Sequence, residues 1–113
     1  MVKLKRVYEP VSPDDGCRVL VERLWPRGIS KQRAALTLWL KDAAPSPDLR
    51  IWFGHDPEKW EEFRLRYMDE LNDNQDALVQ LQGLIDKGDV TLVYAARDTE
   101  HNAAVVLKEY LDR

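Results

Sequence analysis

Residues 89–96, DVTLVYAA, constrain the fold more strongly than any other stretch of the chain. The run is short and apolar, with Gly88 before it and the polar sequence RDTE after it. This pattern is typical of a strand at the centre of a parallel sheet, where both faces are buried. Apolar residues at helical spacing follow from Ala103 to Leu111. The C-terminal part of the chain therefore predicts a buried strand and then a helix, as in half of a Rossmann-like unit.

The other elements follow from the same kind of pattern. Alternating apolar and polar residues predict strands. The pair Asp56-Pro57 predicts a helix start, because Asp is a good cap and Pro is tolerated at the first helical position. In chain order, the expected elements are strands at 2–8, 17–23 and 35–41, helical turns after Ser30 and at 49–53, helices at 57–71 and 75–87, the strand at 89–96 and a helix starting near Thr99.

This order of elements predicts an α/β fold, a small three-layer Rossmann-like domain in which helices flank a mainly parallel sheet of about four strands. A length of 113 residues suits a single domain over residues 1–113. The loop at 9–16 is short for a parallel crossover, which normally takes a dozen or more residues. The first two strands are therefore either antiparallel or joined by a minimal crossover.

Composition limits the classes of function. A net charge of -3 argues against a general nucleic-acid binder, which needs a basic face. No apolar run is long enough to span a membrane, and the N-terminal sequence MVKLKRVYEP is not a signal peptide. The single cysteine permits no intramolecular disulfide, which favours a reducing compartment. We expect a cytoplasmic protein without a membrane partner, and the sequence does not fix its oligomeric state.

Cys17 and Arg23 have the spacing of a cysteine-phosphatase phosphate loop, but the residues between them exclude that loop. A phosphate cradle needs a tight turn, usually with glycines, and no glycine lies between the two. The intervening RVLVE predicts a strand, which would separate Cys17 from Arg23 by about 20 Å at roughly 3.3 Å per residue. Cys17 is therefore expected to be a small core residue.

A ligand site is expected where the strands end. Ligands of open α/β sheets bind outside the carboxyl ends of the strands. Cations, aromatic rings and the start of the last helix follow the predicted strands there. The candidate ligand-binding residues are Arg23, Trp25, Arg27, Trp39, Lys41, Trp52, Tyr94, Arg97 and Asn102.

These residue types favour a small anion such as a phosphate, a carboxylate or a nucleotide. Arginines and free N–H groups at a helix N-terminus bind anions, and tryptophan can stack on a planar ring. His101 is the candidate for moving a proton, and Asp98 for orienting it. No glycine-rich fingerprint indicates a cofactor, and two histidines in the whole chain argue against a protein-only zinc site. The arginines could instead pair with acidic neighbours, and the tryptophans could be core residues.

Three blocks of sequence resemble one family. RVLVERLWPRG, KDAAPSPDLRIWFGHDPEKWEEFRLRYMDEL and TLVYAARDTEHNAAVVLKEYL are similar to the YeaO-like proteins of the domain-of-unknown-function family numbered 488, over about residues 3–112. The resemblance implies a small α/β fold in which the three blocks meet, and it adds His55 to the motif positions. The wider family carries a Cys-His-Arg triplet at the start of the last helix. The matching residues here are Glu100, His101 and Asn102, so the Cys and Arg are absent.

Three hypotheses for function follow. The chain is an enzyme or former enzyme acting on a small anionic substrate, a noncatalytic ligand-binding or regulatory module that uses the same pocket, or a protein-interaction domain that docks through Trp52, Phe53 and Trp60. The missing Cys and Arg motivate the second hypothesis.

Overall fold

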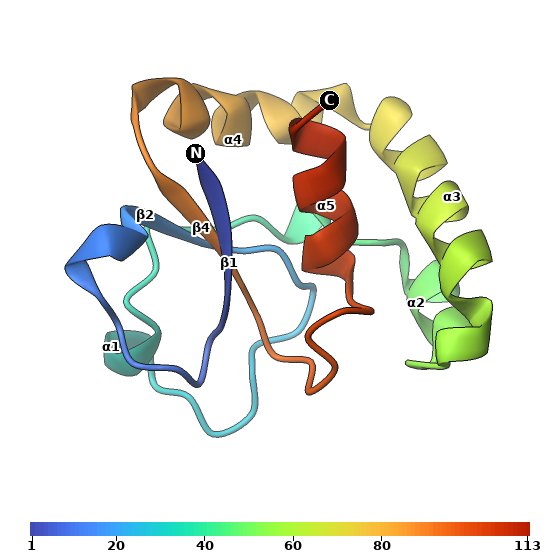
Figure 1. Ribbon diagram of the computed structural model, residues 1–113, viewed down its shortest axis with the longest axis horizontal. Helices are drawn as coiled ribbons and strands as arrows, with labels where there is room; N and C mark the ends of the chain where they lie inside the picture. The colour runs from blue at the N-terminus through green and yellow to red at the C-terminus, as the bar shows by residue number, and fades with distance from the viewer.

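Four parallel strands form one sheet in the computed structural model, which describes residues 1–113 (Figure 1). The spatial order is β1-β4-β2-β3, and every neighbouring pair is parallel. The strands are β1 (Val2–Arg6), β2 (Cys17–Leu20), β3 (Leu38–Trp39) and β4 (Val90–Tyr94). The predicted α/β class with a parallel sheet is confirmed.

Five helices accompany the sheet. They are α1 (Lys31–Ala34), α2 (Pro47–Phe53), α3 (Trp60–Asn72), α4 (Gln75–Lys87) and α5 (Ala103–Leu111). Short 3-10 turns lie at Pro13–Asp15, Lys41–Ala43 and Pro57–Lys59. None of the helices is both long and apolar enough to cross a membrane.

Strand β4 occupies the centre, as its sequence predicts. All five of its residues are buried, and it pairs with β1 on one side and β2 on the other. The first two strands are therefore parallel but not adjacent, and residues 7–16 cross β4 with only one 3-10 turn. Of the two alternatives for this connection, the antiparallel pair is wrong and the minimal crossover is right.

Element boundaries differ most near the carboxyl ends of the strands. Strand β2 stops at Leu20 rather than at residue 23, and the third strand keeps only two residues. The last helix begins at Ala103 rather than near Thr99, because the Asn102 side chain accepts the backbone N–H of Val105 as the cap. The chain therefore has more irregular backbone beside the strand ends than the sequence pattern suggests.

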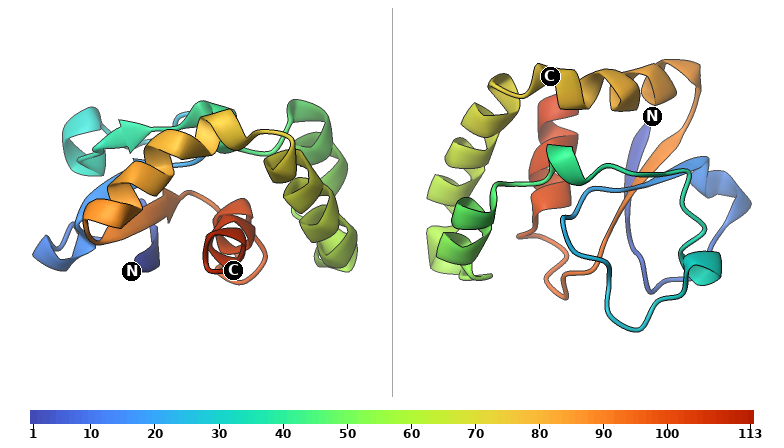
Figure 2. Two further views of the ribbon diagram at one scale, coloured as in Figure 1. Left: turned by 90° about the horizontal axis from the view of Figure 1, so that it is seen from above. Right: turned by 180° about the vertical axis from the view of Figure 1, so that it is seen from behind.

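The two faces of the sheet are covered unequally. Helices α2 to α5 contribute to a core cluster of 19 buried residues on one face, which includes Val19, Leu92 and Tyr67. The opposite face carries a smaller cluster, with Leu20 and Val93 packed beneath α1 and its flanking loops. Views from above and behind show α5, α3 and α2 on one side and α1 at the far edge (Figure 2). The arrangement is consistent with the predicted three-layer fold, with a thin third layer.

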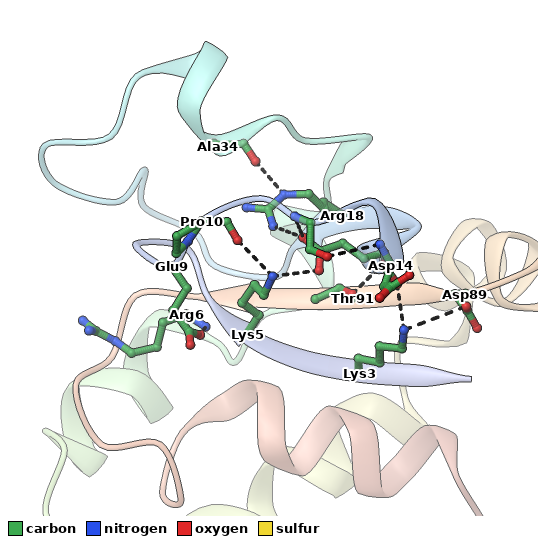
Figure 3. Close-up of polar contacts among 12 residues, drawn as sticks. Lys3, Lys5, Arg6, Glu9, Pro10, Asp14, Arg18, Ala34, Asp89 and Thr91 are labelled. Carbon is green, nitrogen blue, oxygen red and sulfur yellow. Dashed lines mark hydrogen bonds and ion pairs between the residues drawn. The ribbon is translucent and has the colours of Figure 1, made fainter.

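An ionic cluster is buried beneath that thin layer. Asp15 and Arg18 are 5% and 2% exposed, and Arg18 Nη1 donates to Asp15 Oδ2 at 2.7 Å. Lys5 Nζ donates to the other carboxylate oxygen at 2.8 Å, and the Thr91 hydroxyl donates to the Asp15 carbonyl. Figure 3 shows these contacts of Lys5, Arg18 and Thr91 on one face of the sheet. Asp15 therefore ties the 7–16 crossover to all three long strands.

Glycine is required immediately after this cluster. Gly16 has φ of 63°, and a Cβ at that position would lie 2.3 Å from the Asp89 carbonyl oxygen. The close approach lets the Cys17 N–H donate to the same oxygen at 3.0 Å. The crossover can therefore enter β2 only through a residue without a side chain.

The Asp15 cluster predicts a loss of stability in acid. Burial raises the pKa of Asp15, but hydrogen bonds from Lys5, Ser12 and Arg18 more than offset this and lower the pKa from 3.8 to about 2. The resulting stabilisation, about 2 kcal/mol, is fully present above pH 3.8 and is lost as the pH falls toward 2. D15N should lower the free energy of unfolding at pH 7 by about 3 kcal/mol, because Arg18 is left buried and unpaired.

Urea denaturation between pH 2 and 7 measures both effects. D14N is the matched control, because the neighbouring Asp14 carboxylate is exposed and forms no ion pair. An equal loss of stability in D14N and D15N would contradict a specific role for the buried carboxylate.

Candidate functional site

A cavity of about 180 Å³ lies outside the carboxyl ends of β2 and β4. Its walls come from four parts of the chain: the segment after β2, residues 44–45, the end of α2 with the start of α3, and the loop leading into α5. The lining residues are Val21, Glu22, Arg23, Leu24, Ala44, Pro45, Arg50, Phe53, His55, Phe63, Ala96, Asn102 and Ala103. The cavity occupies the place where an open parallel sheet normally binds a ligand.

Arg23 enters this cavity with its charge unpaired. The side chain is half-buried, and its Nε donates to the Pro45 carbonyl at 2.9 Å while Nη2 lies 3.4 Å from the Ala44 carbonyl. Backbone carbonyls fix the guanidinium without neutralising it. The arginines that form ion pairs are Arg18, Arg64 and Arg66. The alternative that Arg23 pairs with an acidic neighbour therefore does not hold.

Helix α2 brings Arg50 and His55 to the same cavity. Ser46 caps the helix through the Leu49 N–H, and Pro47 occupies the first turn. Gly54 and His55 both have positive φ, 53° and 57°, so the chain turns sharply after Phe53. Arg50 is exposed and forms neither an ion pair nor a side-chain hydrogen bond. It is a second unpaired cation on the cavity wall.

Glu22 supplies the only carboxylate of the lining. It is half-buried, and Oε1 accepts the Ala95 backbone N–H at 3.2 Å. Burial raises the pKa of Glu22, an effect that the Ala95 hydrogen bond and nearby His55 oppose. Oε2 has no partner and is not sealed from solvent, and Glu22 forms no ion pair. The alternating pattern of residues 17–23 predicts a strand through Glu22, so the sequence does not mark this residue as part of a site.

The start of α5 forms another wall. Asn102 is buried, with Nδ2 donating to the Asp98 carbonyl and Oδ1 accepting the Val105 N–H. Ala103, the next lining residue, begins the helix. The N–H groups of Ala103 and Ala104 have no acceptor within the helix, and the helix dipole adds partial positive charge there. This end of the cavity therefore favours negative charge.

His101 and Asp98 lie beside the cavity rather than on its wall. His101 Nδ1 lies 2.9 Å from Asp98 Oδ2, and its ring meets the Trp60 ring edge-on at 5.1 Å. A backbone hydrogen bond from Glu100 and the contacts with His101 lower the pKa of Asp98. The two side chains contact each other, but neither lines the cavity.

Two predicted tryptophans and a lysine gather on the side of the small core cluster. Trp25 and Trp39 pack edge to face at 5.2 Å, and Lys41 Nζ lies 3.9 Å from the centre of the Trp39 ring. The Trp25 indole N–H donates to the Ile29 carbonyl, and the Trp39 indole N–H donates to the Glu22 carbonyl. These three residues support the loop after β2 and are not part of the cavity lining.

The remaining predicted residues lie in three places. Arg27 and Arg97 are exposed without ion pairs, and Tyr94 is buried in the main core, where burial raises its pKa. Trp52 is half-buried between the cations of Arg66 and Lys59. Of the ligand-binding residues expected from sequence, the structure brings Arg23 and Asn102 together at the cavity, and it adds Glu22, Arg50 and His55.

The three rings of the docking hypothesis, Trp52, Phe53 and Trp60, are partly to fully buried. Phe53 is 5% exposed and stacks on Phe63 at 4.2 Å, and Trp60 is half-buried against the same rings. Trp52 and Trp60 are both half-buried, so only Phe53 of the three rings is withdrawn from the surface. These aromatic side chains mainly build the wall between the cavity and the α2–α3 core.

No group of three or more His, Cys, Asp or Glu side chains is placed to hold a metal ion. Cys17 starts β2, at the opposite end of the strand from the cavity. The cavity can therefore offer guanidinium groups, one carboxylate, an imidazole and backbone N–H donors to a ligand.

The Asn102 cap predicts a measurable effect on stability. N102A removes the acceptor for the Val105 N–H and should lower the free energy of unfolding by about 1–2 kcal/mol. N102S keeps a capping oxygen without adding a charge beside the Asp98 carbonyl and should cost less than N102A. Thermal unfolding followed by circular dichroism compares the two variants. A larger loss in N102S than in N102A would contradict the capping role.

Comparisons with known proteins give a consistent result. The family model described as "Inactive DUF488-N3 subclade" matches residues 1–113. The uncharacterised protein Rv3073c of Mycobacterium tuberculosis is 46% identical over 98% of this chain and 93% of its own. The uncharacterised protein YeaO of Escherichia coli is 40% identical over 97% of this chain and 96% of its own. No solved structure matches.

Proposed function

We propose that this chain, which belongs to the DUF488 family, binds a small anion in the cavity lined by Arg23 and Arg50. The observation that carries the proposal is the presence of two unpaired guanidinium groups on the wall of one cavity at the carboxyl ends of the strands. Arginine binds carboxylate and phosphate groups through paired N–H donors, which makes these anions the expected partners.

The backbone supports the same charge preference. The start of α5 contributes its lining residue Ala103, whose N–H has no acceptor within the helix, and the positive end of a helix dipole. Arg23 is already oriented by the Pro45 carbonyl, so little side-chain entropy is lost when an anion binds. A preorganised guanidinium and a helix N-terminus together form a recurrent anion-binding arrangement.

The size of the cavity limits the ligand. The cavity has a volume of about 180 Å³. Pockets for drug-sized ligands are larger, about 300–1,000 Å³. Val21, Phe53 and Phe63 provide an apolar surface beside the charged groups. The ligand is therefore a compact molecule with one anionic group and a small apolar part, rather than a nucleotide held whole.

Binding without turnover fits this chain better than catalysis. His101 is held by Asp98 and packs against Trp60, and the cysteine expected in the wider family's triplet is replaced by Glu100. The matching family model describes an inactive subclade, which also favours a noncatalytic role. The noncatalytic module is therefore our preferred function.

Substitution of Arg50 tests the proposal. R50Q should raise the Kd for acetate or inorganic phosphate at least fivefold, because it removes a cation from the cavity while leaving the fold intact. The measurement is a chemical-shift titration of the ¹⁵N-labelled full chain, followed at the amides of Ala96 and Ala103.

R97Q is the matched control and also tests the residue assignment made from sequence. Arg97 is exposed, follows β4 and does not line the cavity, so its removal should change the Kd less than twofold. Anion binding that is unchanged in R50Q but lost in R97Q would move the site away from this cavity. No shift at any cavity amide with either anion in the millimolar range would overturn the proposed function.

A further inference from the structure

The cavity contains an unpaired charge of each sign. Glu22 and Arg23 are consecutive in sequence and line the same space, yet they do not pair with each other. Glu22 is held by the Ala95 N–H, and Arg23 by the Pro45 carbonyl. Each group is therefore fixed by the backbone while its charge stays available to a ligand.

From this arrangement we infer that the ligand is a zwitterion of the α-amino acid class, whose carboxylate meets Arg23 and Arg50 and whose ammonium group meets Glu22. The inference rests on the proposed function and deepens it. A ligand with only a negative charge would gain from the arginines and would be repelled by Glu22. A ligand with only a positive charge would be attracted by Glu22 and repelled by the arginines. An amino acid places both charges within a few bonds of each other.

The environment of Glu22 supports an ammonium partner. One carboxylate oxygen is bound to a backbone N–H, and the other has no partner and remains open. Burial raises the pKa of Glu22, which means that the ionised carboxylate is poorly solvated in the free protein. An ammonium group that donates to the open oxygen would form a charge-assisted hydrogen bond and relieve that cost.

His55 does not already fill this role. It lines the cavity and acts on Glu22 only at longer range, because the two residues form no ion pair. Its side chain is exposed and follows the sharp turn after α2. The open oxygen of Glu22 is therefore free for a donor carried by the ligand.

The apolar wall limits the side chain of the amino acid. Val21, Phe53 and Phe63 line the cavity. Apart from the Glu22 carboxylate and the Asn102 amide, the lining has no carboxylate or amide that could bind a polar side chain of the ligand. Within about 180 Å³, the amino and carboxyl groups leave room for a small aliphatic group. Alanine and leucine bracket the sizes that such a space can hold.

Matched probes separate the contributions of the two charges. Alanine is compared with propanoate, and leucine with 4-methylpentanoate and 3-methylbutylamine, in chemical-shift titrations of the full chain at pH 7. Each carboxylic acid lacks only the ammonium group, and the amine lacks only the carboxylate. We expect at least one of the two amino acids to bind at least tenfold more tightly than its deaminated acid, and the amine to bind more weakly than leucine.

The variant E22Q then assigns the preference to Glu22. Glutamine keeps the oxygen that accepts the Ala95 N–H but removes the charge. We expect E22Q to raise the Kd of the preferred amino acid at least fivefold and to leave the Kd of the deaminated acid unchanged or lower. E100Q is the matched control, because Glu100 is exposed, forms no ion pair and lies outside the cavity lining.

The outcomes distinguish this inference from the proposed function. If the carboxylic acids bind but neither amino acid binds more tightly, the zwitterion is wrong and the anion site stands. If 3-methylbutylamine binds as tightly as leucine, the site is a cation site and the zwitterion is wrong. If neither the amino acids nor the carboxylic acids bind in the millimolar range, both proposals fail. The comparison of probes on the unmodified chain decides these cases even if E22Q destabilises the fold.

Discussion

The parallel pairing of β4 with both β1 and β2 is the constraint on which the rest of the structure depends. Leu92 is in register with Leu4 on one side and with Val19 on the other, so the carboxyl ends of three strands reach the same edge of the sheet. The Ala95 N–H that follows β4 can then reach the Glu22 side chain that follows β2. Residues more than 70 positions apart in sequence meet at the cavity for this reason.

The buried Asp15 cluster and the cavity use charge in opposite ways. Beneath the thin layer, Asp15 is enclosed by Lys5 and Arg18, and the contacts tie the short crossover to the strands. At the cavity, Glu22 and Arg23 are oriented by backbone groups and stay unpaired. Paired charges in the Asp15 cluster contribute to stability, whereas the unpaired charges at the cavity carry an uncompensated cost in solvation.

Sequence patterns predicted the elements whose apolar residues repeat without interruption. Helix α4 matches its expected range of 75–87, because leucines recur at helical spacing and Gly88 ends it. Strand β4 was central for a similar reason, since only a strand buried on both faces tolerates such a run. The carboxyl end of β2 was less predictable: alternation extends through Glu22, but the hydrogen bonds to its neighbours stop near Leu20. Glu22 was therefore assigned to a strand, and its place on the cavity wall could not be seen.

The composition of the site shows why strand ends alone were an incomplete guide. Arg23 and Asn102 flank strands that meet, so the rule for open sheets was sufficient to find them. Arg50 comes instead from α2, a helix of seven residues that packs beside α3 and follows no strand directly, and His55 lies just beyond the end of that helix. The position of His55 depends on the turn made by the consecutive left-handed residues Gly54 and His55, which only the three-dimensional structure reveals. A cavity lined by cations from two separate segments and by one carboxylate is thus a property of the tertiary packing rather than of any one sequence motif.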